Sequence, residues 1–182
     1  MGLRASSTRE LVFTDARVPI ANLIGAENEG FKQAMALLDG GRIGIAAQSL
    51  GIAEAALSEA LVYSQERMQF DKAICEFQAI GTMLADMATE IDAARFLVYR
   101  AAWLKSQGKP HSLEASMAKL YASETANRVA NKALQIHGGY GYTKEFAIER
   151  IYRDQRITQI YEGTSEIQRH VISRLLVGGP RG

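Results

Sequence analysis

The pattern of hydrophobic and polar positions is helical over most of the chain. From Phe31 onward, mainly hydrophobic side chains recur every three or four residues and predict a long helix. This stripe consists of Phe31, Met35, Leu38, Arg42, Ile45, Ser49, Ile52, Ala56 and Ala60. Gly40, Gly41 and Gly44 interrupt it, and each glycine costs about 0.5 to 1 kcal/mol relative to alanine in a helix interior. The cluster indicates either a close approach by a backbone or a ligand, or a kinked or irregular turn.

Two more helices are predicted in the middle of the chain. Residues 76–105 carry apolar side chains in alternating steps of three and four, as in the seam of a helical bundle. A glycine and a proline in the segment 108–110 are expected to end this helix. Ser112 is a candidate N-cap for the next helix, whose apolar pattern reaches Ile136 before the glycine pair 138–139.

The last helical region, residues 147–176, is interrupted near residues 161–164. Gly163 is predicted to end one helix there, and Thr164 or Ser165 to cap the next. Four long helices joined by short loops predict an all-α fold, an antiparallel four-helix bundle that occupies residues 30–182.

Residues 1–29 have a different pattern and are expected to contribute a short β segment. The β-favouring stretch 11–13 and Val18 are separated by turn-forming residues, which predicts one strand and a loop. A single strand cannot bury both of its faces or pair its own edges. The segment therefore either packs onto the bundle or belongs to a sheet that this chain does not contain.

Composition excludes few functions, but it narrows the class of protein. The chain has 182 residues, 47% hydrophobic content and a formal net charge of +1, so neither nucleic acid nor an anionic membrane is an expected partner. No apolar run approaches the roughly 20 residues that cross a bilayer, so membrane insertion is not expected. The single Cys75 cannot form an intrachain disulfide and fits a reducing, cytoplasmic setting. No Glu-x-x-His pair occurs, so a metal site is not expected.

Three polar segments have residue types that suit ligand binding. Asp39 and Arg42 share one side of the first helix, Arg67 offers a forked donor for phosphate, and Phe70 offers a flat face. The segment 135–143 is rich in glycine and aromatic residues at a helix end. Each segment also has an ordinary structural interpretation. For Asp39 and Arg42 it is a surface ion pair, for Arg67 it is compensation of a helix dipole, and for residues 135–143 it is a helix C-cap.

Several motifs, taken together and in order, resemble the C-terminal part of the acyl-CoA dehydrogenases. The motifs are MGLRASSTRELVFTDARVP, which is similar to the family's closing β-domain segment, and then GFKQAMALLDGGRIGIAAQSLG, ERMQF, FQAI, QIHGGYGY and RDQRITQIYEGTSEIQR. These flavin enzymes introduce a double bond next to a CoA thioester, and the short-chain members, such as butyryl-CoA dehydrogenase, are the most similar. The resemblance covers essentially the whole chain and implies that residues 1–29 are a remnant of the family's middle β-domain.

The resemblance implies that Glu162 is the catalytic base. It would remove the α-proton of the acyl-CoA while the β-hydrogen leaves as hydride to flavin N5. Desolvation in a dry slot raises the proton affinity of a carboxylate, and the adjacent Gly163 leaves room for the substrate. The backbone N–H of Glu162 would donate to the thioester carbonyl. Some branches of the family carry their base at the position that is Gly41 here, so Glu162 has no rival in this chain.

The resemblance also implies binding roles for other residues. Substrate contacts fall on Asp39, Gly40, Gly41, Arg42 and Gly163. Contacts to FAD bound mainly by a neighbouring subunit fall on Arg67, Phe70, Gln78, Gln135, Ile136, His137, Gly138 and Gly139. Contacts to the chain's own FAD fall on Thr164, Ser165 and Glu166. The cofactor would then bridge a dimer, so a homo-oligomer is expected. One departure is Asp71, which stands where the family usually has glycine.

Other readings stay open for the chain as a whole. The substrate could instead be a branched-chain or glutaryl-CoA thioester, and the chain could be a non-catalytic helical fragment that only self-associates. The family's N-terminal helical domain and most of its β-domain are missing, so the isolated chain is expected to be inactive. The expected electron acceptor is an electron-transferring flavoprotein, in the cytoplasm or, in a eukaryote, the mitochondrial matrix.

Overall fold

The computed structural model describes residues 1–178, and it confirms the all-α fold. Its α-helices in chain order are α1 (Gly30–Glu66), α2 (Gln78–Ser106), α3 (Ser112–His137), α4 (Ala147–Gln155) and α5 (Ser165–Val177). Short 3-10 helices lie at Ile20–Asn22, Ile74–Glu76, Gly138–Tyr142 and Arg156–Gln159. The two strands, β1 (Met68–Gln69) and β2 (Lys72–Ala73), form a small antiparallel hairpin between α1 and α2.

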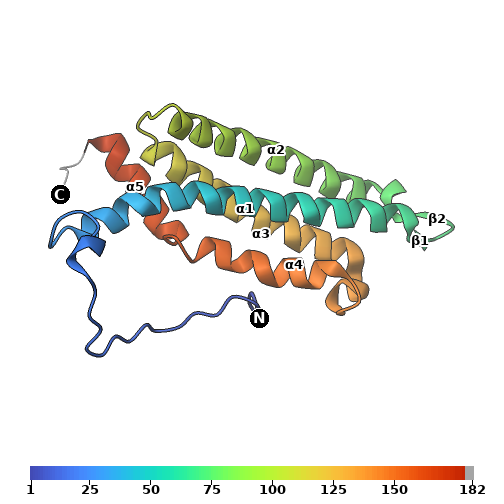
Figure 1. Cartoon of the computed structure of the whole chain (residues 1–182). Helices are drawn as coiled ribbons and strands as arrows, with labels where there is room; N and C mark the ends of the chain where they lie inside the picture. Colours follow the sequence, from blue (N-terminus) through green and yellow to red (C-terminus); the bar gives the residue numbers. More distant parts are fainter. Residues whose placement is uncertain (179–182) are drawn as a thin grey trace.

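The helices form an antiparallel bundle with α3 at its centre. Helices α1, α2 and α3 alternate in direction, α4 runs back along α1 and α3, and α5 turns away at the end of the bundle (Figure 1). Helix α3 packs against all four other helices. Small side chains fill much of this core, including Ala53 and Ala60 of α1 and Ala118, Ala126 and Ala133 of α3. Because interaxial distance depends on the side chains at the contact, these alanines let the helices approach closely.

Helix α1 is continuous through its three glycines, so the alternative of an irregular turn at Gly40, Gly41 and Gly44 is wrong. The helix also extends to Glu66, beyond the predicted stripe. One 18-residue window of it has a mean hydropathy of 1.3, so by length and composition α1 could cross a membrane, contrary to the sequence-based expectation. The same helix packs on α2 and α3, as a core helix of a bundle does.

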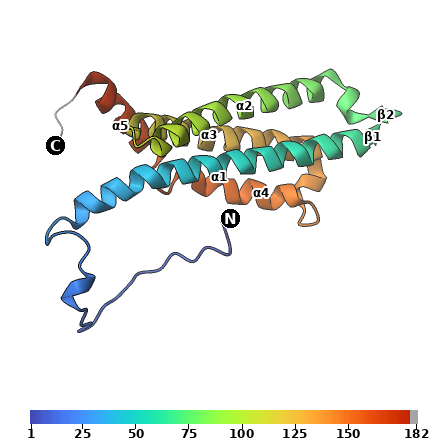
Figure 2. The same cartoon turned by 45° about the horizontal axis from the view of Figure 1, so that its top comes forward.

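The predicted N-terminal strand does not form in residues 1–29. This segment is an extended trace with only the 3-10 turn at Ile20–Asn22; its middle runs away from the bundle, and its first residues return to α4 (Figures 1 and 2). There Arg153 Nη1 donates to the Gly2 carbonyl at 2.9 Å. The apolar side chains of the segment are exposed, for example Phe13 at 78%. A strand requires a partner edge, and the described residues provide none, so β propensity alone does not produce one. Assignment of the segment to a β-domain stays a prediction.

The hairpin after α1 was not predicted from the sequence. Its two loop residues, Phe70 and Asp71, have φ angles of 52° and 63°. Positive φ at both central positions matches the two-residue turn that best suits the twist of a hairpin, and aspartate tolerates this conformation better than most residues. The departure at Asp71 is therefore compatible with a well-formed loop.

The helix ends confirm some predicted caps and correct others. Gly138 ends α3 with φ 58°, as predicted. Thr164 caps α5, because its side chain accepts from the Ile167 N–H at 3.4 Å. Gly163 does not end a helix, since α4 stops at Gln155 and a 3-10 turn follows. Ser112 is not the N-cap of α3: it is the first helical residue and donates its hydroxyl elsewhere.

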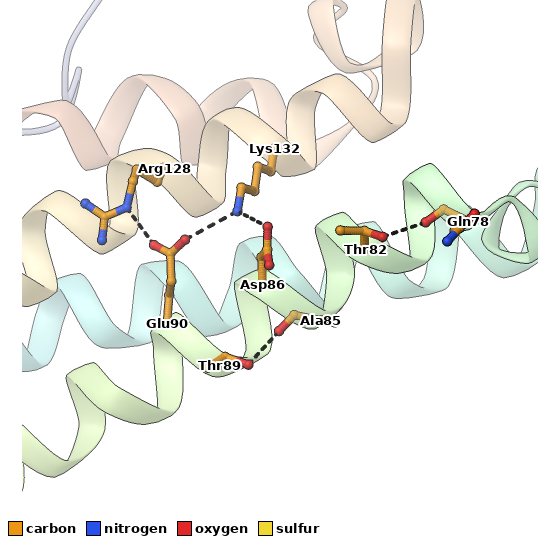
Figure 3. Close-up of polar contacts among 8 residues, drawn as sticks. All are labelled: Gln78, Thr82, Ala85, Asp86, Thr89, Glu90, Arg128 and Lys132. Carbon is orange, nitrogen blue, oxygen red and sulfur yellow. Dashed lines mark hydrogen bonds and ion pairs between the residues drawn. The ribbon is translucent and has the colours of Figure 1, made fainter.

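Charged side chains connect α2 to α3 along one side of the bundle. Lys132 Nζ lies 3.1 Å from Asp86 Oδ2 and 3.3 Å from Glu90 Oε1, and Arg128 Nε donates to Glu90 Oε2 at 2.6 Å (Figure 3). Burial lowers the pKa of Lys132, but the hydrogen bonds to Asp86 and Glu90 have a larger combined effect, so the pKa is raised overall. These contacts fix the register of α2 on α3.

Candidate active site

A sharp turn between the 3-10 helix Arg156–Gln159 and α5 carries the predicted base. Glu162 has φ 54° and Gly163 has φ 88°, so two successive residues are left-handed. For a residue with a Cβ this conformation costs about 1 to 2 kcal/mol, whereas glycine adopts it readily. Surrounding contacts must therefore hold Glu162 in place.

Two buried side chains hold the carbonyls of this turn. Lys119 Nζ of α3 donates to the Gly163 carbonyl at 2.7 Å. Gln168 Nε2 of α5 donates to the carbonyls of both Glu162 and Gly163, at 3.1 and 3.0 Å. Both Lys119 and Gln168 have an exposed fraction of 0%. The turn is thus fixed to α3 and to α5 at once.

The Glu162 carboxylate lies directly over Gly41 of α1. A Cβ placed on Gly41 would lie 2.6 Å from Glu162 Oε2, closer than real contacts allow. A Cβ on Gly40 would meet Lys105 Nζ at 2.8 Å, whereas one on Gly44 meets nothing within 4 Å. A side chain, and not the predicted second backbone, approaches two of the three glycines; the approach of a ligand stays a prediction.

Asp39 and Arg42 form a network that includes α3. Arg42 Nη1 donates to Asp39 Oδ1 at 2.6 Å and to Ser116 Oγ at 3.4 Å. Ser112 Oγ donates to the other carboxylate oxygen of Asp39 at 2.6 Å. Because Arg42 is only 8% exposed, the alternative of an ordinary surface ion pair is wrong. Arg42 Nε is buried without a partner in the described residues, so one donor remains available there.

The charge of Lys119 is linked to the site around it. Burial and the nearby Arg42 guanidinium lower the pKa of Lys119 from 10.5 to about 8, while Glu162 and Glu166 act in the opposite direction. Lys119 therefore remains mostly protonated at neutral pH but titrates within reach of moderately alkaline pH.

A second group of predicted residues surrounds a cleft at the hairpin end of the bundle. The cleft has a volume of about 520 Å³, and its lining includes Arg67, Ile136, His137, Gly138 and Gly139. His137 stacks on Tyr63 with ring centroids 4.3 Å apart, and the Arg67 guanidinium lies 5.3 Å from the Tyr140 ring centre. Phe70, which is 87% exposed, and the exposed Gln78 and Gln135 lie outside this lining.

A third group lies at the start of α5. Thr164, Ser165 and Glu166 line a hollow of about 180 Å³ together with Arg156 and Glu124. The Ser165 hydroxyl is buried and has no hydrogen-bond partner in the described residues. Buried hydroxyls are normally hydrogen-bonded, so this orphan fits a ligand group bound at the helix N-terminus.

Sequence reasoning missed Lys119 and Gln168. A signal existed for Lys119, because it lies in the buried register of α3, three residues before Ala122 and four after Ala115. Gln168 gave no comparable signal, since its role depends on the turn at Glu162. Within residues 1–178, no group of three or more His, Cys, Asp or Glu side chains is arranged to hold a metal ion.

Comparison with known proteins gives one consistent result. Residues 28–177 match the family described as acyl-CoA dehydrogenase, C-terminal domain. The short-chain specific acyl-CoA dehydrogenase of Clostridium acetobutylicum is 56% identical over 95% of this chain and 46% of its own. The caffeyl-CoA reductase-Etf complex subunit CarC of Acetobacterium woodii is 53% identical over 97% of this chain and 47% of its own.

A solved structure supports the same relationship. Butyryl-CoA dehydrogenase from Megasphaera elsdenii superposes with a TM-score of 0.90 at 55% identity, over 91% of this chain and 43% of that one. The chain thus spans less than half the length of the relatives that it matches. By sequence and by fold, it belongs to the acyl-CoA dehydrogenase family and corresponds to the C-terminal domain of its members.

Proposed function

We propose that the chain is the C-terminal domain of an FAD-dependent acyl-CoA dehydrogenase that acts on short-chain acyl-CoA thioesters, with Glu162 as the base. The observation that carries this proposal is the position of the Glu162 carboxylate, which lies over Gly41 on a left-handed turn fixed by buried side chains. Neither packing nor solubility requires a strained, anchored carboxylate at this point of the fold. Proton abstraction next to a thioester does require a fixed base.

The turn also offers a donor for the substrate. Within residues 1–178, the backbone N–H of Glu162 has no hydrogen-bond acceptor. A thioester carbonyl bound against this N–H would receive a hydrogen bond as negative charge develops on its oxygen. The carboxylate of the same residue would then take the α-proton. Bound FAD would supply the acceptor for the hydride that leaves the β-carbon.

The proposed FAD contacts lie in two separate places. Ser165, with its orphaned hydroxyl, lies three residues from Glu162. Arg67 and the glycines at the end of α3 lie at the far end of α1, about 39 Å of helical rise beyond Gly41. This separation supports the proposal that Ser165 and its neighbours meet the chain's own FAD, while the cleft at the hairpin meets the FAD of another subunit in a homo-oligomer.

The Asp39 and Arg42 network is the proposed contact to the substrate beside the base. The identity to short-chain specific relatives favours a short acyl chain over a branched-chain or glutaryl-CoA substrate. The proposed electron carrier is an electron-transferring flavoprotein, in keeping with the Etf complex named for one relative. We place the enzyme in the cytoplasm, or in the mitochondrial matrix of a eukaryote.

One relative favours a second candidate function, because it is named as a subunit of a caffeyl-CoA reductase-Etf complex. The reverse reaction uses the same atoms: protonated Glu162 would return a proton to the α-carbon as hydride reaches the β-carbon. Assays of the complete enzyme with butyryl-CoA and an oxidised carrier, and with crotonyl-CoA and a reduced carrier, separate the two directions.

The base assignment is tested by Glu162→Gln in the complete enzyme, with Glu162→Asp as a partner variant. The glutamine variant keeps the shape of the side chain but cannot accept a proton, so it should bind FAD normally and fail to bleach the flavin with butyryl-CoA. The aspartate variant should retain part of the rate. Near-normal turnover by Glu162→Gln would refute the assignment. The isolated 182-residue chain is expected to show no turnover, and measurable activity would contradict that expectation.

A further inference from the structure

Lys119 has the largest side chain among the fully buried residues of the described chain. A buried ammonium group is strongly disfavoured unless it is paired or hydrogen-bonded. A methionine would fill nearly the same volume in the α3 core without that penalty. Packing alone therefore gives no reason for a lysine at this position.

The ammonium group makes one direct polar contact, to the turn that carries the base. Its Nζ donates to the Gly163 carbonyl at 2.7 Å, and within residues 1–178 it forms no salt bridge. Gln168 alone would leave the Gly163 carbonyl with a single neutral donor. A charged donor makes a hydrogen bond that is roughly twice as strong as a neutral one. Lys119 is thus the stronger of the two anchors of the left-handed turn.

The charged groups that face Lys119 come from three elements. Arg42 faces it from α1, Glu162 from the turn and Glu166 from α5. The Lys119 ammonium group therefore lies between the Arg42 guanidinium on one side and the carboxylates of Glu162 and Glu166 on the other.

We propose that Lys119 is a positioning residue for the base: its buried ammonium group fixes the Gly163 carbonyl and so holds the Glu162 carboxylate over Gly41. This inference rests on the proposed function of Glu162. Lys119 thereby affects the rate of proton abstraction through the position of Glu162, and it does not itself touch the reacting carbon atoms. When Lys119 loses its proton, the turn keeps only a weaker neutral donor and the facing charge disappears.

The test compares Lys119→Met with Lys132→Met in the complete, FAD-loaded enzyme. Both lysines are on α3, but Lys132 pairs with Asp86 and Glu90 on the side of the bundle (Figure 3). Stopped-flow flavin reduction by saturating butyryl-CoA is followed across pH. Lys119→Met should slow reduction about tenfold or more, because a misplaced catalytic group commonly costs that much or more. The KM should change by less than about threefold.

The pH profile separates a positioning role from a merely structural one. Methionine has no proton to lose, so Lys119→Met should lack the fall in rate that the wild type shows as the pH rises through about 8. Lys132→Met should keep the rate and the profile of the wild type. A folded, FAD-loaded Lys119→Met enzyme with the wild-type rate and the wild-type alkaline limb would overturn the proposal.

If Lys119→Met does not assemble, the wild-type enzyme decides the matter. Its reduction rate should fall as the pH rises through about 8, where Lys119 deprotonates, and a flat alkaline profile would overturn the proposal. Glu162→Gln, measured in parallel, distinguishes a failure of the base assignment from a failure of the role proposed for Lys119. If Glu162→Gln stays active, the base assignment fails; if it is inactive while the Lys119 tests are negative, only the role of Lys119 fails.

Discussion

The substitution Gly41→Ala directly tests whether the Glu162 carboxylate has to lie over Gly41, a position that we call the seat of the proposed base. The added methyl carbon would lie 2.6 Å from Glu162 Oε2 and 3.1 Å from its Cδ, whereas ordinary contacts begin at 3.4 Å. The carboxylate is the end of a flexible side chain, so it can retreat, by about 0.8 Å or more. A shift of that size in a catalytic group costs about a hundredfold in rate, or roughly 2.7 kcal/mol in the barrier.

Gly41→Ala should leave the folding stability unchanged or raise it, although it lowers the rate. Alanine in place of glycine within a helix contributes about 0.5 to 1 kcal/mol to folding, and the displaced carboxylate can move toward solvent because Glu162 is only partly buried. Gly41→Ala should therefore melt at or above the temperature of the wild type while reducing its flavin far more slowly. Thermal unfolding and stopped-flow flavin reduction of the complete enzyme measure the two effects separately.

Gly51→Ala is the matched control, because it lies on the same helix and its added methyl meets nothing within 4 Å. It should gain the same helix stability with no loss of rate. A Gly41→Ala enzyme that keeps more than about a third of the wild-type rate constant would refute the proposed seat, since the required shift predicts a much larger loss. An increase in KM alone would indicate that Gly41 contacts the substrate without aligning the base.

Two other predictions follow from the same turn. Gly163→Ala should destabilise the 182-residue chain by about 1 to 2 kcal/mol, because φ is 88° and the new Cβ would lie 2.6 Å from Gln168 Nε2; an unchanged urea midpoint would contradict this. The pKa of Lys119 is lowered to about 8 from 10.5, so between these values the unfolded chain binds more protons and stability rises with pH. Over that pH range the free energy of unfolding of the wild type, measured with urea, should rise by about 1 to 3 kcal/mol relative to that of Lys119→Met. If the two proteins show the same dependence of this free energy on pH, Lys119 is not the group responsible.

The helices could be predicted from the sequence because each buries one periodic stripe. The pattern gave α1 to α3 with small errors at their ends, since the last turns depend on capping groups rather than on the stripe. The N-terminal strand failed for a different reason. The side chains of residues 11–13 favour extended backbone, but a strand also needs a second edge, and the pattern of one segment does not reveal whether that edge exists.

The site was predictable where a local motif carries it. The resemblance singled out Glu162, and the glycines indicated a close approach near Gly41, but neither revealed that the Glu162 carboxylate is the approaching group or that Lys119 and Gln168 anchor the turn. Lys119 was overlooked although a lysine in the register of Ala115 and Ala122 breaks the rule that buried positions are apolar. Such a violation marks a functional or strained site more often than an error of pattern. Gln168 acts through backbone carbonyls, whose positions no side-chain pattern encodes.

The contacts that hold the proposed base all lie within this domain, whereas those of the proposed cofactor site do not. Gly41, Lys119 and Gln168 come from α1, α3 and α5, and together they determine where the Glu162 carboxylate lies. None of these contacts needs a residue outside the chain. The cleft near Arg67 and the hollow near Ser165 lie far apart and open outward, so other parts must complete them. Under the proposed function, the helical domain holds the group that transfers the proton, a step that both directions of the reaction share. A relative named as a dehydrogenase and one named as a reductase could then keep nearly the same helical domain, at 56% and 53% identity to this chain.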